Sequence, residues 1–78
     1  MNRTPVVSSN IRSVGYDPSS LTLEVEFSHG GIYHYLNVPE RLHSGLMNAP
    51  SKGKYLYANI SSRSLEQPFE YRRIFSGT

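Results

Sequence analysis

The sequence predicts a small single domain of the α+β class: a three-stranded antiparallel β-meander packed by a helix, with a second short helix and a C-terminal tail. Residues 21–27 alternate apolar and polar side chains, which is the period of a strand with one buried face. Residues 39–49 instead carry leucines at helical spacing. The chain has 78 residues and no cysteine, so we expect one core layer and no disulfide.

The strands follow in order. Residues 1–7 lack periodicity and are expected to form a flexible lead-in to a domain over residues 8–75, with 76–78 as a tail. Residues 69–75 fit either a closing edge strand or an ordered tail. Residues 10–17 form the first predicted strand, which ends at the turn-forming pair Asp17-Pro18. Residues 21–27 form the second, and the glycines of "SHGG" suit a tight hairpin into the third strand at 32–38.

The register of that hairpin decides where the tyrosine pair, Tyr33 and Tyr35, points. The Gly-Gly pair favours a loop of even length, which places both tyrosines on the outward face with Glu24 and Glu26. The same register puts His34 on the apolar side as a core histidine. A loop of three residues would reverse every one of these positions, because side chains alternate along a strand.

Two helical segments should cover the apolar face of the sheet. The first is residues 39–49, in which Gly45 is unfavourable unless something packs closely against it. The second is residues 51–60 with Ser51 as N-cap, although "YLYANI" also fits a strand. The predicted core is Val14, Tyr16, Leu21, Leu23, Val25, Phe27, Ile32, Leu36, Val38, Leu42, Leu46, Leu56 and Ile60.

A basic segment, residues 41–65, overlaps the two predicted helical segments. The net charge is only +2, but residues 41–65 hold four Lys and Arg side chains and no acid. We therefore consider a nucleic-acid-binding site in which the tyrosine pair stacks on unpaired bases. Phosphates would be met by Lys52, Lys54, Arg63, Arg72 and Arg73. The alternatives are that the tyrosines cover a small core under the C-terminal tail and that the basic side chains are simply solvated.

Other classes of site find little support in the sequence. The three histidines match no metal-ligand spacing, and no nucleophile motif or phosphate loop is present. We expect no catalytic residue, no metal and no cofactor, and hence a protein that is not an enzyme. No apolar run is long enough for a signal peptide or a membrane span, which favours a soluble, cytoplasmic protein.

Several motifs in order resemble the KTSC domain, a family named for the C-terminus of certain lysyl-tRNA synthetases and also found as small bacterial and phage proteins. The matching motifs, all between residues 8 and 60, are "SS", "VGYD", "FSHG", "YHY", "VP" and "SKGKY". The chain departs from the family downstream. It has "YLY" where Y-F-N is usual and "LEQPFEYRR" where Y-P-Y would fall.

The resemblance implies an RNA-binding module, a role suggested for the family by its fusion to a synthetase. RNA is therefore the first expected partner, bound without catalysis. The alternative is a protein–protein interaction module that uses a sheet edge or the face of the tyrosines. We expect a monomer or a weak dimer and no membrane partner.

Overall fold

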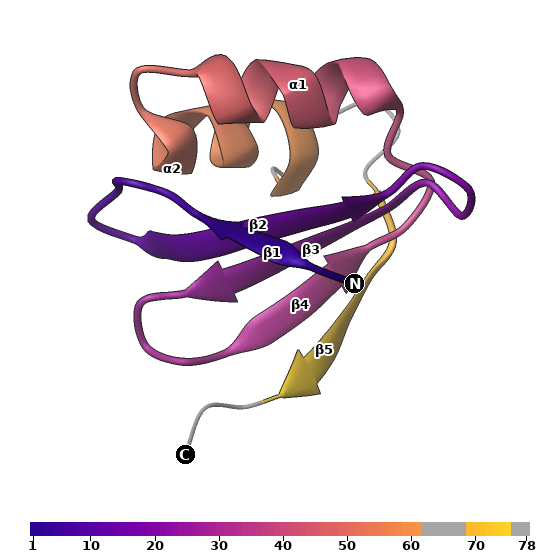
Figure 1. Cartoon of the computed structure of the whole chain (residues 1–78), viewed down its shortest axis with the longest axis horizontal. Coiled ribbons are helices and arrows are strands. Elements are labelled where there is room, and N and C mark those ends of the chain that lie inside the picture. Colours follow the sequence, from indigo (N-terminus) through magenta and orange to yellow (C-terminus); the bar gives the residue numbers. More distant parts are fainter. Residues whose placement is uncertain (62–68, 76–78) are drawn as a thin grey trace.

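A five-stranded antiparallel sheet carries a layer of helices on one face, and no described helix covers its other face, here called the uncovered face (Figure 1). The computed structural model describes residues 1–61 and 69–75. The strands follow in the order β1-β2-β3-β4-β5. The elements are β1 (Arg3–Pro5), β2 (Ile11–Asp17), β3 (Thr22–Phe27), β4 (Ile32–Tyr35), α1 (Glu40–Asn48), α2 (Lys52–Leu56), the π-helical turn η1 (Tyr57–Ser61) and β5 (Tyr71–Phe75).

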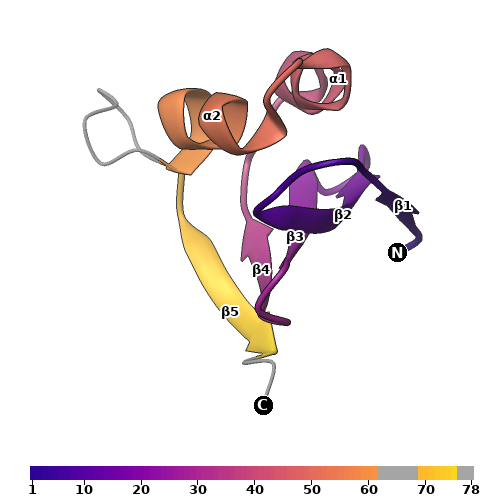
Figure 2. The same ribbon diagram turned by 90° about the vertical axis from the view of Figure 1, so that its left-hand side faces the viewer.

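The α+β class and the single domain are confirmed, but the prediction of three strands was wrong. The central meander β2-β3-β4 gains one strand at each edge. Strand β1 lies in the residues expected as a lead-in and pairs with β2, with Arg3 opposite Gly15. Strand β5 lies within residues 69–75, for which an edge strand was one of the two alternatives, and it pairs with β4. Figure 2 shows β5 curving away from β2.

The β3–β4 hairpin has the opposite facing to the one predicted. Its loop has three residues, 28–30, because the Phe27 N–H donates to the Gly31 carbonyl at 2.9 Å. Gly30 closes the turn with φ of 100°, a conformation that favours glycine. Val25 consequently lies opposite Tyr33, so the tyrosines share the helix-covered face and not that of the glutamates.

The histidine of β4 changes face with the tyrosines. His34 lies opposite Glu24 on the uncovered face, so its expected place in the core was also wrong. The β2–β3 pairing agrees with the prediction that Val14 and Val25 share the core face of the sheet, because they lie opposite each other. Ser13 lies opposite Glu26 on the other face.

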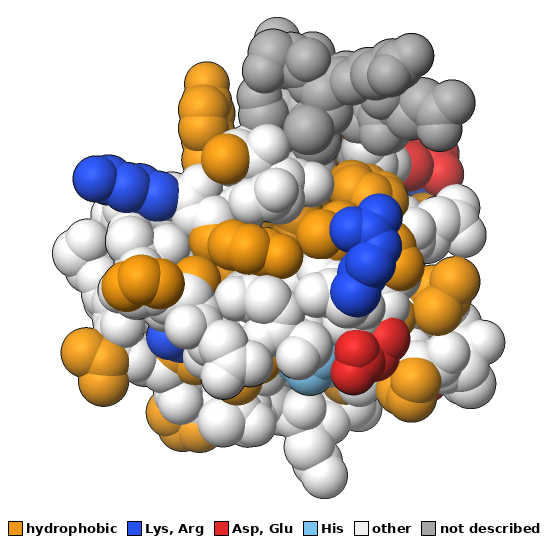
Figure 3. Space-filling view, turned by 90° about the horizontal axis from the view of Figure 1, so that it is seen from above, with side chains coloured by type: hydrophobic (Ala, Val, Ile, Leu, Met, Phe, Trp, Pro, Cys, Tyr) orange, Lys and Arg blue, Asp and Glu red, His pale blue; other side chains and the backbone are white. Residues whose placement is uncertain are grey.

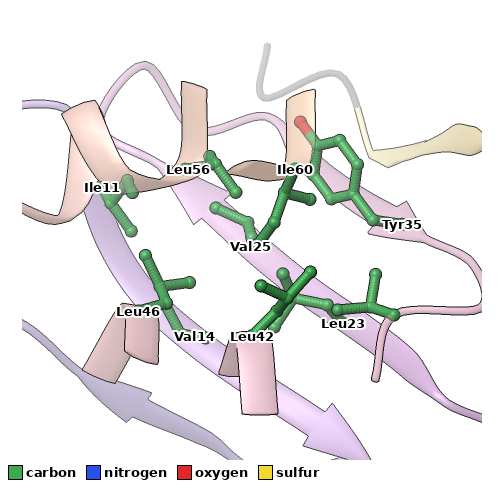
Figure 4. Close-up of a cluster of buried hydrophobic side chains, with 10 residues drawn as sticks. Ile11, Val14, Leu23, Val25, Tyr35, Leu42, Leu46, Leu56 and Ile60 are labelled. Atoms are coloured by element: carbon green, nitrogen blue, oxygen red, sulfur yellow. The ribbon is translucent and has the colours of Figure 1, made fainter. Parts of the chain in front are cut away.

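The core lies between this face of the sheet and the helices (Figure 4). Eight predicted members are confirmed as buried: Val14, Leu23, Val25, Val38, Leu42, Leu46, Leu56 and Ile60. Tyr16 and Phe27 are partly buried and pack against them. Ile11 and Tyr35 are buried members that the sequence did not predict.

Three predicted core residues do not belong to this buried set. Leu21 is 40% exposed because it sits in the β2–β3 turn with φ of 56°, beyond the paired residues. Ile32 lies opposite Glu26 on the face away from the helices, because the three-residue loop reverses the predicted faces of β4. Leu36 lies just past the end of β4 and is only partly buried.

Both predicted helical segments are present, and the second is helical and not a strand. The aromatic ring of Tyr55 packs directly on Gly45, where a Cβ atom would overlap it. This contact between α1 and α2 explains a glycine inside a helix. No helix in the described part of the chain is long and apolar enough to cross a membrane.

Candidate nucleic-acid interface

The uncovered face of the sheet carries a compact polar cluster. The Glu24 carboxylate accepts a hydrogen bond from Arg3 Nη1 at 2.7 Å and lies 2.7 Å from His34 Nε2. Ser13 donates to Glu26 at 2.8 Å. Burial alone would raise the pKa of Glu24, but the hydrogen bonds from His34 and Arg3 outweigh it and lower that pKa. These groups satisfy one another, so we assign the cluster a structural role.

The helix-covered side is hollowed along α2 and η1. A basic hollow of about 340 Å³ lies between residues 7–10 and 50–54. A central hollow of about 510 Å³ shares Asn10 and Gly53 with it. An aromatic hollow of about 330 Å³ shares Phe27, His29 and Ser61 with the central one. Because neighbouring hollows share walls, we treat them as one groove, here called the α2 groove.

Aromatic rings line the far end of the α2 groove. The rings of Phe27 and His29 stack with centroids 5.7 Å apart, and Tyr33 meets Phe27 edge-on at 5.5 Å. Tyr71 from β5 completes this wall, with its ring 5.9 Å from that of Tyr35. The central hollow adds Tyr57, whose side chain is exposed. Rings on several sides suit a flat apolar ligand.

The two predicted tyrosines differ in accessibility. Tyr35 is only 5% exposed, and burial, followed by the neighbouring Tyr33 and Tyr71, raises its pKa to about 12. Figure 4 shows its ring beside Ile60. Tyr33 is partly buried and accepts a hydrogen bond from Arg73 Nε at 2.9 Å. The Arg73 guanidinium also lies 5.4 Å from the centre of the Tyr33 ring, a cation–π contact.

The predicted basic residues are distributed over the fold. Lys52 and Lys54 line the basic hollow, where Lys52 Nζ donates to the Ala49 carbonyl at 3.0 Å. Arg73 stands at the aromatic end, whereas Arg72 pairs with His34 and so belongs to the uncovered face. Arg63 lies outside the described residues. From above the helices, Lys and Arg side chains appear at separate places and form no continuous patch (Figure 3).

The structure therefore brings Tyr33 together with Arg73, and Lys52 with Lys54, at opposite ends of one groove. Four further aromatic groups of the groove were not predicted as site residues: His29, Tyr57, Phe69 and Tyr71. The hairpin glycines were the available signal, because a three-residue loop turns β4 toward the helices. No Asp or Glu lines any of the three hollows within the described residues.

Metal binding finds no site in the part of the chain that the structure describes. There, no group of three or more His, Cys, Asp and Glu side chains is arranged to hold a metal ion.

Comparison with known proteins gives a consistent result. The model of the KTSC domain family matches residues 7–63. An uncharacterised protein of Stutzerimonas stutzeri is 46% identical over 55 residues, which cover 70% of this chain and 78% of that protein. The crystal structure of a KTSC domain protein from Yersinia pestis superposes with a TM-score of 0.84 at 44% identity, covering 94% of this chain and 96% of that one.

A third relative is much longer. The lysine–tRNA ligase of Nostoc is 38% identical over 66 residues, which cover 85% of this chain but only 11% of the ligase.

Proposed function

Because this chain belongs to the KTSC domain family, we propose that it is a non-catalytic RNA-binding module that holds a single strand of RNA in the α2 groove. The relative in Nostoc is named as a lysine–tRNA ligase, which associates the domain with an enzyme that acts on RNA. A module of this kind is expected to act in the cytoplasm.

The observation that carries the proposal is the adjacency of the three hollows of the α2 groove, which lead from lysines to aromatic rings. Lys52 and Lys54 stand at one end, and Tyr33 and Arg73 stand at the other. With the corrected hairpin register, Glu24 and Glu26 lie on the opposite face of the sheet. Carboxylates that would repel phosphate beside the tyrosines are thereby removed from the site.

The two ends would contact different parts of a nucleotide chain. Lysine side chains neutralise phosphate, and this contribution weakens as salt rises. A base entering the aromatic hollow meets Tyr33, His29 and Tyr71, and stacking contributes about 1–3 kcal/mol per base. Tyr35 supports this wall from within the core and is not itself a stacking surface.

Duplex RNA suits the groove less well. Its bases are already stacked and its sequence-bearing edges lie in a deep groove, so aromatic side chains bind unpaired nucleotides instead. The proposal therefore specifies a single-stranded segment, a loop or an end.

Binding of a fluorescently labelled oligouridine, followed by anisotropy at several salt concentrations, tests the proposal. The variant Lys52→Gln/Lys54→Gln removes both cations of the basic hollow. The logarithm of the affinity falls with the logarithm of the salt concentration, and each phosphate contact to a single strand makes this slope steeper by about 0.7. Loss of two contacts should therefore make the slope shallower by about 1.4. The matched control is Arg41→Gln, an exposed cation on α1 that lines none of the three hollows.

The control should bind like the parent protein. Equal loss in the control and in the lysine variant would show that binding follows overall charge and would contradict a site in the groove. Absence of any binding at low salt would contradict RNA binding altogether.

A further inference from the structure

The outer edge of β5 is the second surface that a partner can use. We propose that it binds an extended acidic segment of another protein, which pairs with β5 as a further strand of the sheet. The RNA site uses the side chains of Tyr71 and Arg73 but not this backbone edge. A measurement of backbone pairing therefore tests strand addition without testing RNA binding.

The two edges of the described sheet differ in their capacity to pair. Strand β1 has only three residues and contains Pro5, which lacks the N–H that a ladder needs. Strand β5 has five residues and no proline, and every one of its side chains is exposed. Proline and very short length, two features that block strand addition, are therefore absent from β5. Its two arginines and the irregular pairing between Ile32 and Tyr33 restrict the edge to a partner of complementary charge.

The register shows which backbone groups of β5 are available. The Leu36 N–H donates to the Glu70 carbonyl at 2.8 Å, which makes these two residues a hydrogen-bonded pair. Hydrogen-bonded and non-hydrogen-bonded pairs alternate in an antiparallel ladder. His34 with Arg72 is therefore the next bonded pair, and Tyr71 and Arg73 sit at non-bonded positions. Their N–H and C=O groups point away from β4, toward the open edge.

The side chains of β5 indicate the chemistry of the partner. Arg72 and Arg73 project from opposite faces of the strand, and within the described residues neither has an acidic side chain at salt-bridge distance. Ile74 and Phe75, each 52% exposed, extend the strand with apolar surface. An incoming strand with carboxylates on both faces and apolar residues toward the end of β5 complements this edge.

The same arginines disfavour a second copy of the chain as the partner. In antiparallel self-pairing centred on the strand, Arg72 or Arg73 would face an arginine of the other copy. Like charges directly opposite in a sheet are destabilising. Charge thus favours an acidic strand over a homodimer.

A peptide titration on the whole labelled protein tests the proposal by NMR. The probe is a peptide of about seven residues that alternates glutamate pairs with valines, long enough to cover β5. Two further peptides carry N-methyl groups on alternate amides, one on the odd positions and one on the even positions. Because only alternate amides of an added strand face β5, one methylated peptide should bind about tenfold or more weaker than the other.

Variants of Arg73 separate the backbone from the charge. Arg73→Ala removes the cation but keeps the backbone N–H. Arg73→Pro removes the cation and the backbone N–H, and it leaves the hydrogen bonds between β5 and β4 intact because this N–H points away from β4. We expect weaker binding by Arg73→Ala and a further loss for Arg73→Pro. If the proline variant does not fold, the methylated peptides on the parent protein still decide the question.

Shifts centred on Tyr71 and Arg73, with slowed exchange of their amides and unequal binding of the two methylated peptides, would support strand addition. Equal binding of those peptides, shifts centred on Lys52, Lys54 and Tyr57 of the α2 groove, or no shift at about 1 mM peptide would overturn it. A peptide-independent shift of β5 that grows with protein concentration would also overturn it, because the edge would then serve a second copy.

Discussion

Replacement of Glu24 by glutamine tests the polar cluster that fixes β1 to the sheet. The Glu24 side chain is 11% exposed and holds Arg3 at 2.7 Å and His34 at 2.7 Å. Glutamine preserves the shape but removes the charge to which both neighbours bond. The variant should therefore unfold more easily while keeping the same fold.

The magnitude follows from the two hydrogen bonds. A bond to a charged group contributes about 1.5–3 kcal/mol and a neutral one about 0.5–1.5 kcal/mol. Weakening two bonds in this way gives a loss of about 2 kcal/mol at neutral pH. For a domain of this size, the midpoint of thermal unfolding should fall by roughly 8–16 °C.

The contribution of Glu24 to the free energy of unfolding should change with pH in one direction. Because the pKa of Glu24 is lowered in the folded protein, its contribution to stability is present above the ordinary glutamate pKa. That contribution is lost as the pH falls through the folded value. The parent protein should therefore approach the stability of Glu24→Gln in acid, although the two differ at neutral pH.

Urea unfolding followed by circular dichroism at about pH 7 and about pH 3 measures both quantities. Glu70→Gln is the matched control, because Glu70 is exposed, and it should change stability by less than about 0.5 kcal/mol. A difference between parent and Glu24→Gln that is the same at both pH values would refute the reasoning, since the charge would then not be its source.

Three other predictions concern the core. Leu46→Ala, at a fully buried position, should destabilise the protein by about 2–5 kcal/mol in urea unfolding. Gly45→Ala should destabilise it by about 1–2 kcal/mol because the new methyl group meets the Tyr55 ring. In a Tyr55→Ala background the same change should stabilise by about 0.8–1 kcal/mol, and a loss there would rule out the ring contact as the cause. Because Tyr35 has its pKa raised from 10.0 to about 12, stability should fall as the pH rises between these values, and less so in Tyr35→Phe.

The sequence predicted those parts of the fold that depend on local periodicity. The alternation in residues 21–27 and the leucine spacing around α1 gave the central strands, the helix and most of the core. Gly45 was flagged as needing a close neighbour, and Tyr55 is that neighbour. These features follow from side-chain patterns within one element.

The remaining features depend on a single backbone conformation or on distant pairing. One residue of loop length, set by Gly30 at positive φ, decided which face receives Tyr33 and Tyr35. Strand β5 is exposed along its length and has no alternating pattern of its own, so the sequence left an edge strand and an ordered tail open, and the pairing with β4 decides between them. The α2 groove depends on both, which is why its aromatic half was not predicted as a unit.

An NMR titration of the labelled protein with a short mixed-sequence RNA, at low and at raised salt, tests the central claim most directly. If RNA binds in the α2 groove, shifts should follow the groove from Lys54 through Tyr57 to Tyr33 and should fade as salt rises. Shifts confined to the uncovered face around His34, or no shifts at low salt, would contradict it.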